Sequence, residues 1–183
     1  MNRMTDFARF DHELHFQYDM RYERRHPEVR KEDLSEVMSS VGACFFMLRD
    51  RFWDLEGLDE ATGSWGQVGT EVACKSWLSG GRQVVNKTTW FSHLFRTQKG
   101  FQFPYKISGN DQERAREYSR ALWLGNRWTK QTRPLSWLVE HFWPVPGWAD
   151  PIGADALAQV KAAGTAFPHI DVSADAREGA HHG

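Results

Sequence analysis

A carboxylate, a histidine and an arginine, side chains that could take part in catalysis, occur close together in the segment 63–96, GSWGQVGTEVACKSWLSGGRQVVNKTTWFSHLFR. Glu71 stands at the start of a predicted helix, where a carboxylate suits the helix dipole. His93 ends a predicted strand and precedes Arg96 in the spacing His-x-x-Arg. An imidazole can bind a metal ion, and a guanidinium matches phosphate oxygens. A metal ion beside such an arginine is what a departing nucleotide diphosphate requires, because both neutralise the charge that grows on the phosphate.

Each of these residues also has a structural interpretation. A lone histidine commonly serves only packing, since histidine is intermediate in burial. Glu71 can form an i,i+4 ion pair with Lys75 on the same helix. Trp65 is either a core residue or a platform for a sugar or a base, and its neighbouring glycines favour the platform, because they allow a close approach of the backbone. The sequence leaves these alternatives open.

A second group of metal-ligand types occurs near the N-terminus, at Asp11, His12, His15 and Asp19. Alternation along a strand would direct His12 and His15 to opposite faces. The sequence therefore disfavours a metal site there.

The elements that must position these residues follow from periodicity and turn residues. We expect strands at 14–18, 41–48 (buried), 83–85 and 88–91, with a turn at 86–87. We expect helices at 50–58, from an N-cap at Thr70 to Gly80-Gly81, and from Asn110 or Asp111 to about Asn126. The charged N-terminal segment is expected to form a loop or a frayed helix broken at Pro27, and 134–148 one helical turn followed by an extended segment.

Composition limits the class of protein. The chain has 183 residues, enough for one domain with a core, and its net charge of −1 provides no global attraction to nucleic acid. Most of the nine Trp and twelve Phe side chains are expected in the core. Cys44 and Cys74 lie in apolar runs, which favours two buried free thiols. We find no secretory signal and no apolar run of about 20 residues, so we expect a cytoplasmic protein without a membrane span.

Residues from about 10 to 128 resemble the C-terminal half of a GT-A glycosyltransferase catalytic domain, most of all the polypeptide N-acetylgalactosaminyltransferases and related glycosyltransferase family 2 enzymes. The similar pieces follow the family's order: FDHELHF, VGACFFMLRDRFWDLEGLDE, the Trp-Gly motif and helix GSWGQVGTEVACKSWLSGG, the metal-histidine motif FSHLFR, the loop QKGFQFP, and the helix NDQERAREYSRALW.

The resemblance implies an α/β fold: a partial GT-A fold, the C-terminal half with a mixed sheet and flanking helices. Residues 1–150 would form this half, and 151–183 a weakly structured tail. The implied roles are a Mn²⁺ (or Mg²⁺) ligand for His93, contact with the diphosphate of a UDP-sugar for Arg96, a loop over the nucleotide for Lys99 and Phe101, the lining of the donor and acceptor cleft for Trp65, and a catalytic carboxylate for Glu71.

The sequence also departs from the family pattern. Val68 and Gly69 stand where an acidic residue and an Asn or Asp are usual, so Glu71 is the nearby carboxylate that can substitute. Lys99 and Phe101 replace the usual histidine and tyrosine of the loop. The family's Asp-x-Asp or Asp-x-His metal motif is absent from the sequence, as is its nucleotide-binding half.

The resulting expectation is a glycosyltransferase fragment or subunit that transfers a sugar from a UDP-sugar to an acceptor hydroxyl of a protein, a glycan or modified DNA, in a bacterial or phage setting. A partner chain would supply the nucleotide-binding half. The alternative is a non-catalytic module that binds a glycan, a peptide or nucleic acid.

Overall fold

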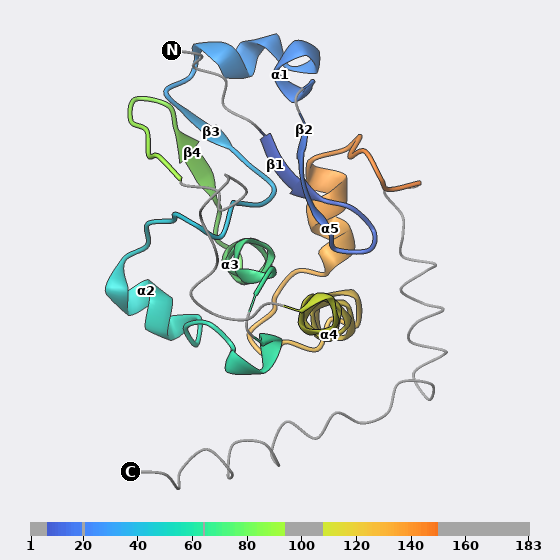
Figure 1. Cartoon of the computed structure of the whole chain (residues 1–183). Coiled ribbons are helices and arrows are strands. Elements are labelled where there is room, and N and C mark those ends of the chain that lie inside the picture. The colour runs from blue at the N-terminus through green and yellow to red at the C-terminus, as the bar shows by residue number, and fades with distance from the viewer. Residues whose placement is uncertain (1–6, 20, 64, 94–107, 150–183) are drawn as a thin grey trace, which may run out of the picture.

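The computed structural model describes residues 7–19, 21–63, 65–93 and 108–149, and it has the expected mixed α/β character (Figure 1). The strands are β1 (Phe7–Phe10), β2 (Phe16–Asp19), β3 (Leu34–Glu36) and β4 (Val84–Asn86). The α-helices are α1 (Tyr22–Arg25), α2 (Arg49–Asp54), α3 (Val68–Leu78), α4 (Gly109–Ser119) and α5 (Leu135–His141). Short 3₁₀ helices η1 (Pro27–Lys31) and η2 (Glu60–Thr62) and a π-helical turn η3 (Arg120–Leu124) complete the described elements.

The described strands form two separate antiparallel pairs, β1–β2 and β3–β4, so the expectation of one mixed sheet was wrong for this part of the chain. The first pair is a hairpin, with Phe7 opposite Asp19 and Phe10 opposite Phe16. The second pair joins segments far apart in sequence, with Leu34 opposite Asn86. Strands this short and antiparallel need no long helical crossover, which a parallel sheet would require.

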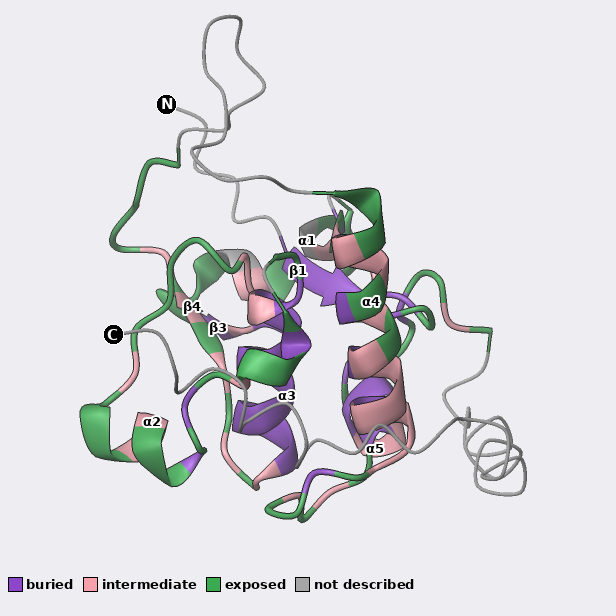
Figure 2. Cartoon of the chain, turned by 60° about the horizontal axis from the view of Figure 1, so that its bottom comes forward, coloured by how far each residue is buried: buried purple, intermediate pink, exposed green. Residues whose placement is uncertain are grey.

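Helix α3 is the centre of the molecule. All of its residues except Val68 are buried, as the purple ribbon in Figure 2 shows, so this helix is enclosed rather than amphipathic. Trp77 is 2 % exposed, and its indole N–H donates to the carbonyl of Val37 at 3.1 Å. The core around α3 receives side chains from β1, η3, α5 and the connecting segments: Phe10, Leu14, Met38, Leu55, Trp123, Trp128, Leu135, Leu138 and Val139.

The prediction for α3 is wrong at the N-terminal end of the helix and correct at its C-terminal end. The helix begins at Val68 with Gln67 as its N-cap residue, so Thr70 is not the N-cap, and its hydroxyl is buried within the first turn. Glu71 still lies in that first turn. The helix ends at Leu78, and Gly80 has a φ of +90°, which fits a glycine at the helix end.

Helix α4 forms where the sequence predicts it, but its N-cap is Ser108, so the expectation that Asn110 or Asp111 caps it was wrong. Ser108 and Asp111 form a capping box, and η3 continues the helix to Leu124. Helix α5 is followed by an irregular segment with a turn at 145–148, not by the expected extended segment, and this segment packs on the β1–β2 hairpin. There the Trp148 indole N–H donates to the Phe10 carbonyl at 3.0 Å. The charged segment broken at Pro27 is also as expected, since α1 and η1 lie on either side of that break.

Two predicted strands are wrong. Residues 41–48 form no strand, and Phe46 is 93 % exposed, because the neighbouring Val37 and Met38 fill the core instead. Residues 88–91 also form no strand, since β4 pairs with β3 and the Asn86 side chain accepts from the Thr88 N–H at 2.9 Å and turns the chain.

The two cysteines are both free, but only one is buried. Cys74 lies inside α3, where burial raises the pKa of its thiol well above the ordinary value. Cys44 is exposed, so the expectation of two buried thiols was wrong for this residue. No helix among the described residues has the length and apolar character needed to cross a membrane.

Candidate functional site

A small pocket lies where the chain between α2 and α3 meets the first turn of α3. Its volume is about 210 Å³. The lining residues are Leu58, Asp59, Glu60, Thr62, Gly63, Trp65, Gly66, Gln67, Val68 and Glu71. Trp65 and Glu71, which the sequence singled out separately, therefore line one cavity.

Trp65 supplies the aromatic surface of this pocket. Its side chain is 42 % exposed, so it is not a core residue. Gly63 and Gly66 on either side have φ of +86° and +108°, and a Cβ on either would have no atom within 4 Å. These glycines are thus required by backbone conformation and leave open space beside the indole. An exposed indole with open space around it suits a flat or sugar-like ligand.

Glu71 forms the inner end of the pocket and is 2 % exposed. Its Oε1 lies 2.8 Å from Nζ of Lys75, so the i,i+4 ion pair considered from the sequence is present. The same oxygen accepts from the backbone N–H of Asp59 at 2.7 Å, and Oε2 accepts from the hydroxyl of Thr62 at 3.4 Å. Both carboxylate oxygens are engaged by the pocket's own wall. The role of Glu71 as a catalytic residue stays a prediction.

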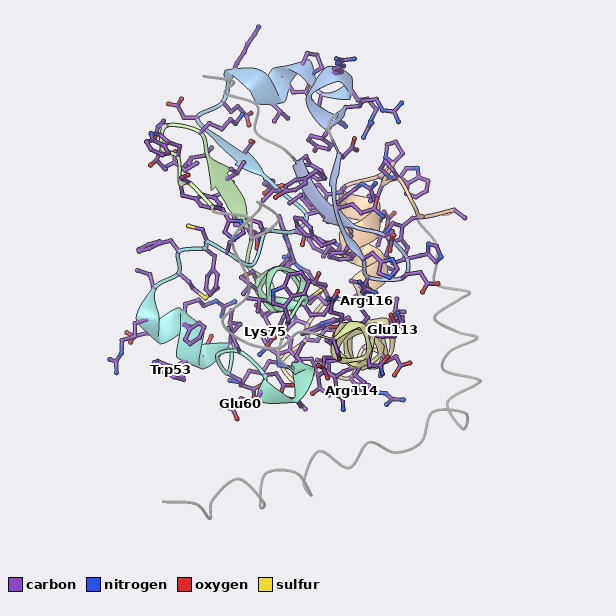
Figure 3. All side chains as sticks on the ribbon, in the orientation of Figure 1. Trp53, Glu60, Lys75, Glu113, Arg114 and Arg116 are labelled. Carbon is purple, nitrogen blue, oxygen red and sulfur yellow. The ribbon has the colours of Figure 1, made fainter. Side chains whose placement is uncertain are left out.

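Lys75 extends these contacts further into the protein. Its ammonium group is buried, donates to the Gly57 carbonyl at 2.9 Å and lies 6.0 Å from the ring centre of Trp128. Figure 3 shows Lys75 on the central helix and Glu60 on η2 at the outer side of the molecule. A buried carboxylate without such a partner would be costly, so Lys75 allows Glu71 to remain charged beneath the pocket.

Asp59 shapes the wall between Glu71 and α4. Its Oδ1 accepts from the Ala61 N–H at 2.9 Å, which caps η2, and its Oδ2 accepts from the hydroxyl of Tyr118 in α4. Burial, followed by the hydrogen bond and the charge of Asp59, raises the pKa of Tyr118. The hydroxyl therefore stays protonated, and a donor, well above neutral pH.

The pocket has a definite charge character. Asp59, Glu60 and Glu71 carry carboxylates, and no Lys, Arg or His is among the ten lining residues. Lys75 balances only Glu71. The pocket suits uncharged or cationic groups and opposes phosphate.

His93, the other predicted site residue that the structure describes, does not line this pocket. His93 is exposed, in an irregular segment beyond β4. Arg96, Lys99 and Phe101 lie outside the described residues, so their assignments stay predictions. The sequence analysis missed Asp59, Glu60 and Tyr118 as parts of the site. The position of Asp59 in a turn bounded by glycines, two residues before Ala61, could have predicted that it caps η2.

Close backbone packing explains why Gly69 stands where the resemblance leads us to expect an Asn or Asp. A Cβ on Gly69 would lie 1.7 Å from the carbonyl oxygen of Ser40 and 3.1 Å from the backbone nitrogen of Gly42. The first turn of α3 thus packs directly on the backbone of the preceding segment. An Asn or Asp at this position would require that packing to change.

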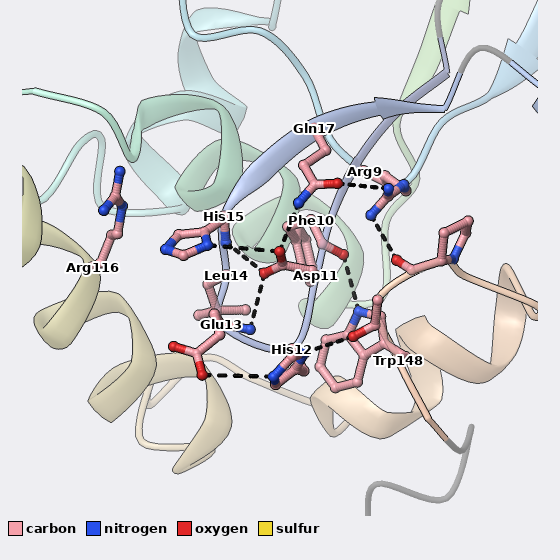
Figure 4. Close-up of polar contacts among 12 residues, drawn as sticks. Arg9, Phe10, Asp11, His12, Glu13, Leu14, His15, Gln17, Arg116 and Trp148 are labelled. Carbon is pink, nitrogen blue, oxygen red and sulfur yellow. Dashed lines mark hydrogen bonds and ion pairs between the residues drawn. The ribbon is translucent and has the colours of Figure 1, made fainter.

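Within the described ranges, no group of three or more His, Cys, Asp or Glu side chains is placed to hold a metal ion. One histidine ligand does not complete such a centre. The cluster near the N-terminus has another role, which Figure 4 shows. Asp11 accepts from the N–H groups of Glu13 and His15, both at 3.0 Å, and from the Gln17 side chain at 2.7 Å, so it shapes the hairpin turn.

Comparison with known proteins finds similarity to animal glycosyltransferases. The chain is 31 % identical over 98 residues to Polypeptide N-acetylgalactosaminyltransferase 10 of Mus musculus, and equally to that of Homo sapiens, which covers 51 % of this chain and 16 % of each relative. It is 30 % identical over 78 residues to N-acetylgalactosaminyltransferase 6 of Drosophila melanogaster, which covers 42 % of this chain and 12 % of that relative.

These matches indicate a glycosyltransferase-like region in about half of the chain. They span only a small part of the relatives' own length. No family model matches the chain, and no solved structure matches it. Because the relatives are animal proteins, they give no support to the expected bacterial or phage origin.

Proposed function

We propose that this chain is the acceptor-side and metal-histidine part of a glycosyltransferase that moves a sugar from a UDP-sugar to an acceptor hydroxyl. In this proposal His93 is one ligand of a Mn²⁺ or Mg²⁺ ion, and Arg96 contacts the diphosphate. A partner chain supplies the nucleotide-binding half and the remaining metal ligands, while this chain alone keeps a weak, manganese-dependent contact with the diphosphate of UDP through His93 and Arg96. The acceptor oxygen forms a bond to the anomeric carbon, the bond from that carbon to the diphosphate breaks, and the hydroxyl proton passes to a base.

One observation supports the proposal: a chain of which about half is similar to N-acetylgalactosaminyltransferases also brings Trp65 and Glu71 together in one pocket. The pocket is smaller than the roughly 300–1,000 Å³ of sites that bury a drug-sized ligand. A single sugar residue suits this volume better than a complete nucleotide sugar.

The charge of the pocket also supports a sugar inside the pocket and a diphosphate outside it. A sugar presents hydroxyl and amide groups that carboxylates can accept from, and its apolar face can pack on an indole. A diphosphate would be repelled by Asp59 and Glu60. The proposal therefore assigns the sugar to the pocket and the diphosphate to Arg96 and the metal ion.

The first experiment is calorimetric titration of the full chain with UDP, with and without manganese. We expect binding that requires manganese and that is lost in Arg96→Ala and in His93→Ala. A second titration uses N-acetylgalactosamine, and Trp65→Ala is expected to weaken it by about tenfold, the loss typical of one stacking contact. Trp53→Ala is the matched control, because Trp53 is also exposed but lies on α2 outside the pocket.

A non-catalytic binding module is the second candidate, and the contacts of Glu71 favour it. Both oxygens of that carboxylate are occupied by Lys75, Asp59 and Thr62. Saccharide binding that depends on Trp65 but not on manganese or UDP would establish this candidate over a transferase. Binding of neither UDP nor saccharide would overturn both.

A further inference from the structure

Helix α4 contacts the pocket wall although none of its residues lines the pocket. The hydroxyl of Tyr118 donates to Oδ2 of Asp59, a residue that does line it. These two residues are far apart in sequence, so this hydrogen bond ties the wall to a distant part of the chain that packs against it. Tyr118 is half-buried and hence partly shielded from water.

The wall is held from two sides through Asp59. On the side of α3, the backbone N–H of Asp59 donates to Glu71 at 2.7 Å. On the side of α4, the carboxylate of Asp59 accepts from Tyr118, and its other oxygen caps η2 through the Ala61 N–H. A carboxylate with donors on both oxygens has a fixed orientation, and so has the short helix that it caps.

We infer that Tyr118 is a positioning residue of the pocket, and that its hydroxyl, acting through Asp59, holds the wall formed by residues 58–63 in the conformation that receives a ligand. This inference rests on the proposed function for the identity of the ligand, a sugar residue. The hydrogen bonds of the wall test the positioning role independently of any ligand.

The experiment compares the full chain with Tyr118→Phe, which removes only the hydroxyl oxygen. Hydrogen exchange is measured at the amides of Asp59, Ala61 and Thr62, and N-acetylgalactosamine affinity is measured by titration. We expect about tenfold faster exchange at these amides, the effect of losing one hydrogen bond to a charged group, and about fivefold weaker saccharide binding. Exchange in α3 should be unchanged.

Two further variants separate positioning from general destabilisation. Tyr22→Phe is the matched control, since Tyr22 lies in α1 outside the pocket, and it should leave the wall amides unaffected. In an Asp59→Ala background, Tyr118→Phe should have no additional effect on saccharide affinity, because the residue through which it acts is gone.

Exchange at 59–62 that is unchanged in Tyr118→Phe, or accelerated equally throughout α3 and α4, would overturn the inference. An additional loss of saccharide affinity in the Asp59→Ala background would also overturn it. Local acceleration at 59–62 in a protein that binds no saccharide would keep the role of Tyr118 and overturn the proposed function.

Discussion

The buried ion pair between Glu71 and Lys75 gives the strongest single prediction. Lys75→Met preserves the length and apolar character of the side chain but removes its charge. Glu71 would then lose its cationic partner in a position that is 2 % exposed and would retain hydrogen bonds from Asp59 and Thr62 only. The carbonyl of Gly57 would also lose its donor.

The magnitude follows from burial. Removing one partner of a buried ion pair costs about 3–5 kcal/mol, because the remaining charge has no partner and little water. The hydrogen bonds that Glu71 retains place the expected loss near the lower value, about 3 kcal/mol. For a domain of this size that loss lowers Tm by about 6–12 °C.

The assay is urea unfolding followed by tryptophan fluorescence, with Tm from calorimetry. Arg114→Met is the matched control, because it also removes one cation of a helical pair, with Asp111, but at an exposed position. We expect no measurable change in that variant. In Glu71→Gln/Lys75→Met no charge is left buried and an acceptor for the Asp59 N–H remains, so the double variant should be more stable than Lys75→Met alone.

Two results would refute this reasoning. One is a Lys75→Met protein that unfolds within about 1 kcal/mol of the original chain, which is the range of an exposed pair. The other is a double variant that is less stable than the single one, which would mean that Glu71 contributes through contacts that do not depend on its charge.

Three other substitutions test separate parts of the structure. Gly69→Ala should destabilise the protein by about 3 kcal/mol in urea unfolding, because its Cβ would overlap the Ser40 carbonyl, whereas Gly109→Ala, with no atom within 4 Å, should stabilise it by about 0.5 kcal/mol; equal effects would contradict the close packing of α3. The raised pKa of Tyr118 means that the folded protein holds this proton more tightly, so the stabilisation by the hydroxyl is present below the ordinary value of 10.0 and is lost as pH rises above it. Unfolding measured from pH 8 to 11 should therefore show that the difference in stability between the original chain and Tyr118→Phe becomes smaller above pH 10. A difference that grows above pH 10 would contradict this direction of the pKa shift. Phe46→Ser should change the free energy of unfolding by less than about 0.5 kcal/mol, since Phe46 is 93 % exposed. A loss of several kcal/mol would instead support the buried strand at 41–48 that the sequence predicted.

The parts of the structure that depend on neighbours in sequence could be predicted from it. The end of α3 at Gly80, the course of α4 and the pairing of Glu71 with Lys75 all depend on residues within one or two helical turns. The same holds for the break at Pro27, where a ring without an N–H ends one short helix and begins another.

The errors occur where the outcome depends on distant partners. The apolar run 41–48 has the composition of a buried strand, but composition does not state whether a neighbouring strand is available. Residue 84 and its neighbours pair with β3 instead of with 88–91, and that choice is made by residues about 50 positions away. Likewise, nothing near Asp59 in the sequence indicates that Tyr118 would bind it.

The distribution of charge restricts how a nucleotide sugar could use this site. Asp59 and Glu60 line the pocket without a cation among the lining residues, and Lys75 lies beneath Glu71, where it is already paired. A diphosphate entering the pocket would gain no cation and would approach at least two negative charges, which in a partly desolvated site costs several kcal/mol of binding free energy. Under the proposed function, the diphosphate would therefore stay outside, and only the uncharged sugar would reach Trp65. A cation outside this cavity would then have to secure the donor, and the pocket would select the sugar without holding the nucleotide.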